Sequence, residues 1–360
     1  MRDADARHED ALDALTLLGI PRIGLRDWHR RVATFGSATA ALARIPQSAE
    51  CAAARRDAAS ALDGARDLGI RVLVHGDADY PSGLHDLTRC DSNTLSPAPP
   101  VLFALGDLSL LQRPAVAIVG TRHASATGLR AAERIARECA DAGALVISGL
   151  ARGIDAAAHT GALSSTGFTA AVIGTGLDIA YPADHRGLQS RIARDGLVLS
   201  ELAPGQRATR GSFPERNRLI AALAQLTIVV EAGHKSGALL TARAANTLNR
   251  ACAAVPGSFD VAACLGSNEL LRDGAHVIAA VDDVLALLQL SKGSTAMSVN
   301  PGSLTDAERA IWNVIGSAPL DLDLVVERSG WAADTCLAAV TTLELKGLVR
   351  ATHAGALHRA

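Results

Sequence analysis

Residues 116–128 read VAIVGTRHASATG, and this stretch decides the fold class. An apolar run, Val116 to Val119, ends at Gly120, and a helical pattern, LRAAERIARECADAG, follows the small residues of the loop. This order predicts a strand, a tight loop and a helix, because glycine lets the backbone turn where a side chain would clash. A helix N-terminus beside Arg122 suits a phosphate or another anion. The loop has neither G-x-G-x-x-G nor G-x-x-x-x-G-K-[ST], so a Rossmann-like turn without a ligand stays an alternative.

Short apolar strands alternate with helical runs from residue 114 to residue 290. Further strands are predicted at 144–148, 169–174, 197–201, 227–232 and 251–257. Such alternation predicts βαβ units and a mostly parallel sheet with right-handed crossovers. We therefore expect an α/β fold with an extended Rossmann-like sheet. Ligands of such sheets bind outside the carboxyl ends of the strands, so the loops after these strands are the candidate sites.

The chain divides into four predicted parts. Residues 1–68 form a small helical domain, and residues 69–290 form the Rossmann-like domain, whose Pro-punctuated lead-in (70–112) could supply edge strands or cover. Residues 291–303 are a linker of small residues. Residues 304–360 suggest three short helices and a β-wing, which is typical of a winged helix. Its third helix is not a strong DNA-reading helix, so a protein contact or a lid is an equal alternative.

The sequence GIPRIG (19–24) joins two short amphipathic helices in the first part. A turn of this kind is typical of a helix-hairpin-helix or SAM-like domain, in which backbone N–H groups can touch a nucleic-acid phosphate. The alternative, which we favour, is a small helical bundle that binds nothing.

Composition excludes several classes of protein. The 360 residues carry a net charge of −2, so anion binding has to come from local patches. Six scattered cysteines without a C-x-x-C motif argue against a disulfide framework and a structural zinc site. The N-terminus is polar and charged, and no apolar run has the roughly 18 residues of a membrane helix. We expect a cytoplasmic protein.

A second glycine-rich loop, SGLARGIDAAAH (148–159), repeats the logic of the first. Ser148, Gly149 and Arg152 could make a second phosphate contact. The alternative is a tight turn in which Asp155 pairs with Arg152. His159 shares a helical face with Asp155, and we expect a structural role for that pair.

The third loop, GTGLDIAYP (174–182), follows another strand. We expect Asp178 to pack or cap, although it could bind a ribose hydroxyl. Tyr181 could stack on a base, but filling the core is the interpretation that we favour.

The segment 204–220 is the most charged. It holds four arginines, Arg207, Arg210, Arg216 and Arg218, against one glutamate, Glu215, and it contains Phe213. Basic residues around an aromatic ring suit a nucleic-acid backbone with one stacked base. The alternative is a solvated loop whose arginines pair with acidic neighbours.

The segment 231–245 offers another anion-binding helix N-terminus, at Lys235, Ser236 and Gly237. No nucleophile elbow, Cys/His pair or cluster of metal carboxylates appears in the sequence, so we expect neither an enzyme nor a cofactor or metal site.

Taken together, these segments resemble the DNA-processing protein A (DprA, also called Smf) family. The matching pieces are VGTRHASATG, SGLARGIDAAAH, GTGLDIAYP, SELAPG, FPERNRLIA, EAGHKSGALLTARAA and AVPGS with GSNELLRDGA, in family order over about residues 115–280. The resemblance implies a homodimer that binds single-stranded DNA without reading its sequence. It also implies that the protein helps to load RecA recombinase onto DNA that enters during natural transformation.

The resemblance maps the DNA pocket onto Arg122, Ser148, Gly149, Arg152, Phe213, Arg216, Asn217 and Arg218. With the anion-binding turns above, the expected DNA contacts also include Gly120, Lys235, Ser236 and Gly237. One departure stands out. Ala183 and His185 occupy places where family members often carry lysine and asparagine, and Arg186 could restore the charge.

Two other functions compete with DNA binding. The Rossmann-like core also resembles the LOG nucleotide phosphoribohydrolases, which would make the protein a nucleotide-binding or nucleotide-hydrolysing one. Those proteins carry PGGxGTxxE at a strand end, where this chain has EAGHKSGALLTARAA. A purely structural adaptor is the third alternative.

Overall fold

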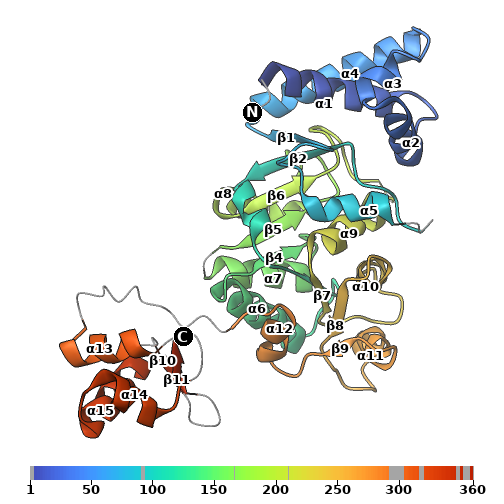
Figure 1. Cartoon of the computed structure of the whole chain (residues 1–360). Helices are drawn as coiled ribbons and strands as arrows, with labels where there is room; N and C mark the ends of the chain where they lie inside the picture. Colours follow the sequence, from blue (N-terminus) through green and yellow to red (C-terminus); the bar gives the residue numbers. More distant parts are fainter. Residues whose placement is uncertain are drawn as a thin grey trace. The chain divides into compact units, whose positions relative to one another are not determined.

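The computed structural model describes residues 4–90, 94–165, 167–209, 211–291, 304–315, 320–345, 349–351 and 357–359. The chain forms two units, Met1–Leu290 and Ser291–Ala360, which are treated separately below (Figure 1). The predicted linker lies outside the described residues apart from Ser291, as do Arg210 and Lys346.

One sheet of nine strands, counted over the described residues, organises the first unit. Its order is β1-β2-β6-β5-β4-β3-β7-β8-β9. The bounds are Arg71–Val74 (β1), Val101–Gly106 (β2), Ala115–Val119 (β3), Leu145–Ser148 (β4), Thr169–Val172 (β5), Leu197–Ser200 (β6), Leu226–Val229 (β7), Ala251–Ala254 (β8) and His276–Val277 (β9). Strands β3 to β9 pair in parallel, whereas β2 pairs antiparallel with β1 and β6. The mostly parallel sheet is confirmed, and the lead-in supplies the antiparallel edge.

The strand order reverses direction at β3. The chain runs from β3 through β4 and β5 to β6 on one side, and then returns to place β7 on the other side of β3. Such a switch point leaves a crevice at the carboxyl ends of the strands, because the two loops leave β3 and β7 in opposite directions. Here those loops begin at Gly120 and Val230.

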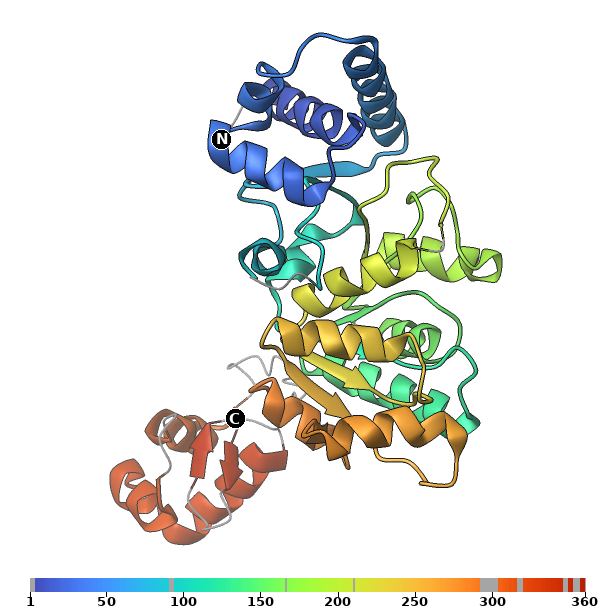
Figure 2. The same ribbon diagram turned by 90° about the vertical axis from the view of Figure 1, so that its right-hand side faces the viewer.

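Helices cover both faces of the sheet (Figures 1 and 2). Alternation along β3 decides which core each residue joins: Ala117 and Val119 pack with α9 and α10, whereas Val116 and Ile118 pack with α6, α7 and α12. The helices are α6 (Ala126–Asp141), α7 (Ile154–Leu163), α8 (Arg186–Asp195), α9 (Ser212–Leu223), α10 (Ala238–Thr247), α11 (Leu265–Arg272) and α12 (Val281–Leu287). Alanines fill much of the packing between these helices and the sheet.

Four helices precede the sheet: α1 (Ala4–Gly19), α2 (Leu25–Phe35), α3 (Ala38–Leu42) and α4 (Ala49–Asp67). The turn between α1 and α2 falls where GIPRIG predicts it. Leu17 and Leu62 of these helices share a core with Phe103 of β2. The ring of His29 is also 2.8 Å from the Ala98 carbonyl oxygen, so the helical domain packs directly on the edge of the sheet. The lead-in also contains a short helix, α5 (His85–Arg89).

The second unit has helices α13 (Asp306–Val314), α14 (Leu322–Ser329) and α15 (Ala333–Leu345), and an antiparallel pair, β10 (Val349–Ala351) with β11 (Leu357–Arg359). Ile311, Val325 and Leu343 are buried at its centre. Three helices and a two-stranded wing confirm the predicted winged helix. Over the described part of the whole chain, none of the helices combines the length and the apolar character needed to cross a bilayer.

The close packing of α6 on α7 depends on Gly161. A Cβ atom there would overlap the Glu133 carbonyl group of α6, whereas a Cβ at Gly187 on α8 meets nothing within 4 Å. We therefore expect Gly161→Ala to lower the free energy of unfolding by about 1–3 kcal/mol through overpacking. Gly187→Ala should be neutral or stabilise by up to about 1 kcal/mol, because alanine has the higher helix propensity. Urea unfolding of the two variants checks this, and equal stability would contradict the packing argument.

Candidate nucleic-acid interface

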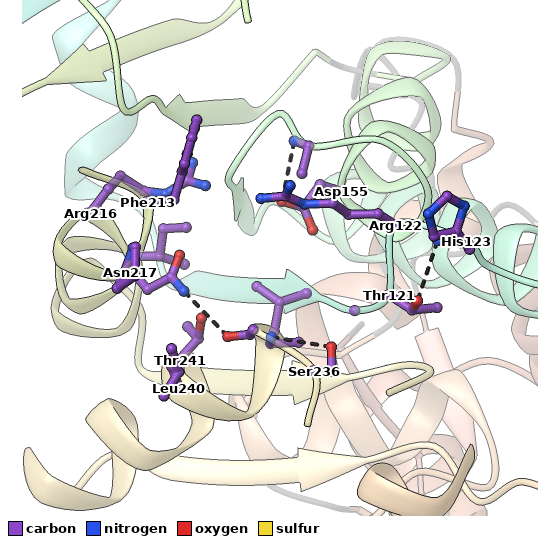
Figure 3. A pocket seen from close by; sticks show the side chains of 17 residues that line it. Thr121, Arg122, His123, Asp155, Phe213, Arg216, Asn217, Ser236, Leu240 and Thr241 are labelled. Atoms are coloured by element: carbon purple, nitrogen blue, oxygen red, sulfur yellow. Dashed lines mark hydrogen bonds between the residues drawn. The ribbon is translucent and has the colours of Figure 1, made fainter. Parts of the chain in front are cut away.

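A hollow of about 430 Å³ lies at the switch point of the sheet. Figure 3 shows Arg122 and His123 on one side of it and Phe213, Arg216 and Asn217 on the other. The segments that form it are the end of β3 with its loop, the first turns of α7 and α9, and the start of α10. Its lining residues are Val119, Gly120, Thr121, Arg122, His123, Ala151, Asp155, Phe213, Pro214, Arg216, Asn217, Ile220, Ser236, Gly237, Ala238, Leu240 and Thr241.

Seven of the expected contact residues line this one hollow although they come from three separate segments. They are Gly120, Arg122, Phe213, Arg216, Asn217, Ser236 and Gly237. The Asn217 side chain donates to the Gly237 carbonyl oxygen over 3.3 Å, which links α9 to the start of α10 across the hollow (Figure 3). The predicted convergence of the strand-end loops therefore holds for these residues.

A cation and two aromatic rings form a stack at the mouth of the hollow. The Arg122 guanidinium carbon lies 5.5 Å from the centroid of the Phe213 ring, and the Tyr181 ring lies 4.9 Å from Phe213. Tyr181 is 47% exposed, so the expectation that it fills the core was wrong. Its position in a loop, outside any strand or helix, was the available signal. The two rings, tilted by 35° to each other, lie next to one positive charge, which suits a nucleobase and a phosphate.

Arg216 is a buried positive charge beneath this stack. Its Nη1 donates to the Gly149 carbonyl oxygen over 2.6 Å and also to the Val172 carbonyl oxygen. A Cβ atom at Gly149 would lie 2.6 Å from the Arg216 guanidinium carbon, so only glycine leaves room for it. Burial lowers the pKa of Arg216 to about 10, so the group is still charged at neutral pH. The carbonyl ends of β4 and β5 thus hold a fixed cation at the hollow.

Asp155 does not pair with Arg152, contrary to the structural alternative. Its carboxylate accepts the backbone N–H groups of Gly149 and Ala151, over 3.1 and 3.4 Å, and so holds the loop after β4. Burial raises the pKa of this carboxyl group. Arg152 instead forms an exposed ion pair with Asp184 at 2.5 Å. Arg152 is therefore not among the residues that line the hollow, although its neighbour Ala151 is.

His159 is structural. It is fully buried, its Nδ1 lies 2.8 Å from the Thr169 hydroxyl oxygen, and burial lowers its pKa to about 3. Within the described residues, no group of three His, Cys, Asp or Glu side chains is placed to hold a metal ion.

The N-terminus of α6 is not the open anion site that the sequence predicts. The Gly128 N–H donates to the Ser125 hydroxyl, and the Ser125 N–H and O–H donate to Glu231 over 3.1 and 3.0 Å. Glu231 is buried and follows β7, and a Cβ at Gly128 would overlap its carboxylate. A carboxylate of the protein therefore takes the place of a bound phosphate at this helix.

Three expected DNA contacts, Ser148, Gly149 and Arg218, are inside the protein, and Gly149 is covered by the Arg216 guanidinium. Ser148 is fully buried and donates to the Ile118 carbonyl oxygen over 2.6 Å, because its side chain points across the sheet and not out of its end. Arg218 is 2% exposed and lies 2.7 Å from Glu201 and 3.5 Å from Glu215. The segment 204–220 thus contains one paired arginine of the kind that the solvated-loop alternative describes. None of Ser148, Gly149 and Arg218 lines the hollow.

The remaining expected residues divide as follows. Lys235 is exposed next to the hollow without lining it. Arg207 is also exposed outside the lining. Asp178 accepts the Gly205 N–H over 2.9 Å, which is the capping role that was favoured.

Ala183, His185 and Arg186, at and beside the places where the sequence departs from the family pattern, have different surroundings. Ala183 is exposed and carries no charge. The His185 ring lies 2.9 Å from the Leu150 carbonyl oxygen, which turns it toward the backbone. Arg186 is exposed at the start of α8.

His123, Leu240 and Thr241 line the hollow although the sequence did not single them out as contacts. His123 stands inside the motif that carries Arg122, and the other two lie one turn into the helix after Gly237.

If Glu231 acts as a built-in anion, its removal should both weaken α6 and open a real anion site. We expect Glu231→Ala to lower the free energy of unfolding by about 1–2 kcal/mol, and phosphate to restore part of that loss. Thermal unfolding in phosphate and in chloride of equal ionic strength measures both effects. Glu133→Ala, at an exposed position of α6, is the control. Unchanged stability without a phosphate effect would show that Glu231 does not cap the helix.

Several known proteins are similar to this chain over most of its length. It is 36% identical over 316 residues to the protein Smf of Synechocystis, covering 78% of this chain and 77% of that protein. It is 42% identical over 203 residues to the DNA processing protein DprA of Streptococcus pneumoniae, covering 56% and 72%.

Two solved structures have the same fold and 32% sequence identity. The structure of DNA processing protein A from Streptococcus pneumoniae matches with a TM-score of 0.61 over 79% of this chain and 98% of that one. The protein from Helicobacter pylori, whose structure was determined for its single-stranded DNA binding mode, matches with a TM-score of 0.54 over 61% and 95%.

Three family models match consecutive parts of the chain. The model for a DprA-like N-terminal HHH domain matches residues 8–66, the model for DNA recombination-mediator protein A matches residues 71–289, and the model for the DprA winged helix domain matches residues 295–355. The second of these alone covers more than half of the chain, and the fold and hollow described above belong to that part. The chain is therefore a member of the DNA recombination-mediator protein A (DprA/Smf) family.

Proposed function

We propose that the hollow at the switch point binds single-stranded DNA without reading its sequence. The observation that carries this is the stack of Arg122, Phe213 and Tyr181 above the buried Arg216. Every base has a flat face that stacks on an aromatic ring, and every nucleotide has a phosphate that a cation attracts. The related protein from Helicobacter pylori, solved for its single-stranded DNA binding mode, supports the same assignment.

The geometry favours a strand over a free mononucleotide. In Rossmann-type nucleotide sites, the phosphate lies at the N-terminus of the helix after the first strand. Here Glu231 occupies that end of α6 and would repel a phosphate. Asp155, the carboxylate that lines the hollow, already accepts two backbone N–H groups. These two observations weigh against the LOG-like alternative, and we assign no catalytic step to the hollow.

We further propose that the protein acts as a homodimer in the cytoplasm and loads RecA recombinase onto the bound strand during natural transformation. The RecA and transformation roles rest on family membership. The homodimer is supported by large apolar side chains that lie exposed after β8, in the segment that leads to the last strand: Phe259, Val261, Leu265 and Val277. Phe259 alone is 86% exposed, and β9 has no second neighbour in the sheet within the described residues. Exposed large apolar side chains in a segment that ends at a strand edge are consistent with a protein interface.

Arg122→Ala should weaken single-strand binding and make it less sensitive to salt. One lost phosphate contact lowers the slope of log affinity against log salt by about 0.7 for a single strand. Fluorescence anisotropy with oligothymidylate and with a duplex of equal length, over a salt series, measures this. Arg137→Ala, on the exposed side of α6, removes the same charge elsewhere and should match the wild type. Absence of single-strand binding by the wild-type protein at low salt would overturn the proposed function.

The dimer proposal has its own test. Phe259→Asp should convert the protein to monomers, because a charge in the centre of an apolar interface is costly to desolvate. Sedimentation velocity gives the mass of each form. Phe35→Asp, at an exposed phenylalanine of α2, is the matched control and should keep the wild-type mass. A monomeric wild-type protein, or a dimeric Phe259→Asp variant, would contradict the interface.

A further inference from the structure

An exposed ion pair lies beside the stack at the mouth of the hollow. The Arg152 guanidinium, in the loop after β4, lies 2.5 Å from the carboxylate of Asp184, in the loop after β5. The side chains of Arg152 and Asp184 are 59% and 70% exposed, so a ligand can reach both charged groups. An exposed pair of this kind contributes little to stability, because water solvates both charges when they separate. Another anion held nearby can therefore take the place of the carboxylate on Arg152.

The two neighbours of Arg152 in the chain fix its backbone at the hollow. Ala151 is one of the lining residues. Gly153 packs so closely on the loop after β3 that a Cβ atom there would lie 2.3 Å from the Thr121 carbonyl oxygen and 2.9 Å from the Arg122 carbonyl oxygen. The backbone of Arg152 is therefore held beside that of Arg122, one residue away from the lining.

The turn that carries Asp184 is attached to the same surroundings. Tyr181, three residues earlier, packs on Phe213 with 4.9 Å between the ring centroids. The ring of His185, the next residue, lies 2.9 Å from the Leu150 carbonyl oxygen, in the loop that also carries the arginine of the pair. The ion pair is therefore held between the aromatic rings of the stack and the loop after β4.

The ion pair decides what charge a bound strand meets on this side of the stack. A base on Tyr181 has a phosphate on each side, because a phosphate links every nucleoside to the next. Arg122 is the cation on the other side of the stack. Residues 181–185 include neither lysine nor arginine, so the cation that reaches this turn is Arg152. While the pair is closed, the carboxylate of Asp184 neutralises that cation and repels a phosphate that approaches it.

We propose that Asp184 competes with the bound strand for Arg152. In the free protein the carboxylate holds the guanidinium, and in the complex a phosphate beside the base on Tyr181 takes its place. Because part of the binding free energy is spent on opening the pair, Asp184 lowers the affinity of the hollow for every sequence alike. The inference rests on the proposed function, since it concerns the same strand and the same stack.

The test is a double-mutant cycle of Asp184→Asn and Arg152→Ala, with oligothymidylate binding measured by fluorescence anisotropy. Asp184→Asn removes one negative charge in either background, and this general effect on a polyanion is the same in both. When Arg152 is present, the substitution also frees a cation. The gain in affinity should therefore be about two- to fivefold greater with Arg152 than in the Arg152→Ala background, which is the range that exposed ion pairs contribute.

Glu133→Gln, at an exposed position of α6, is the matched control. It removes a carboxylate that is not paired with Arg152, so its effect on affinity should be equal in the two backgrounds. A gain from Asp184→Asn that is no greater with Arg152 than without it would overturn the proposal, because the carboxylate would then act only by repelling the strand. That outcome leaves single-strand binding by the wild type, and with it the proposed function, intact. If the wild type binds no strand at low salt, the proposed function and the role of Asp184 both fail.

Discussion

One buried guanidinium determines the geometry of the whole hollow. Arg216 donates to carbonyl oxygens at the ends of β4 and β5, and these bonds fix the start of α9 against the sheet. Because Phe213 and Asn217 belong to the same helical turns, their positions follow from that attachment. A charge held in this way keeps its place whether or not a strand is bound, so the site pays little reorganisation on binding. Removal of Arg216 would leave two strand-end carbonyl groups without their donor.

Carboxylates of the protein itself accept hydrogen bonds or form ion pairs at three places around the hollow. Glu231 caps α6, Asp155 holds the loop after β4, and Glu201 neutralises Arg218. Arg122 is exposed and has no ion pair within the described residues, and the Phe213 ring lies beside it with Tyr181 next to that ring. The end of α6, where a Rossmann-type framework ordinarily holds a phosphate, is thus occupied by a carboxylate, and the exposed cation and rings lie at the hollow instead. This arrangement supports the proposed recognition of a strand over that of a single nucleotide.

The sequence predicted the parallel sheet and the convergence of the strand-end loops, because these follow from periodicity and from the geometry of parallel strands. It offered edge strands as one role of the lead-in but did not predict their antiparallel pairing. The sequence could not show that Arg122 lines the hollow whereas Arg218 is buried in an ion pair. Both are arginines in segments that follow a strand, but Arg218 lies in the middle of α9, where it is buried and paired with Glu201. Ser148 failed for a similar reason, since the last residue of a strand points either outward or across the sheet and the spacing does not decide which. Tyr181 was expected in the core but is exposed, and its contact with Phe213 could not be predicted because the two residues are distant in sequence.

The contact between Gly128 and Glu231 has an evolutionary consequence. Any side chain at position 128 would collide with the carboxylate, and loss of the carboxylate would leave the donors of Ser125 without an acceptor. A substitution of either residue alone is therefore expected to destabilise the fold, which makes each single change unfavourable. We therefore expect the two positions to change together. A double variant that lacks the carboxylate would have an open end of α6, with N–H groups free to bind a small phosphate ester as their partner.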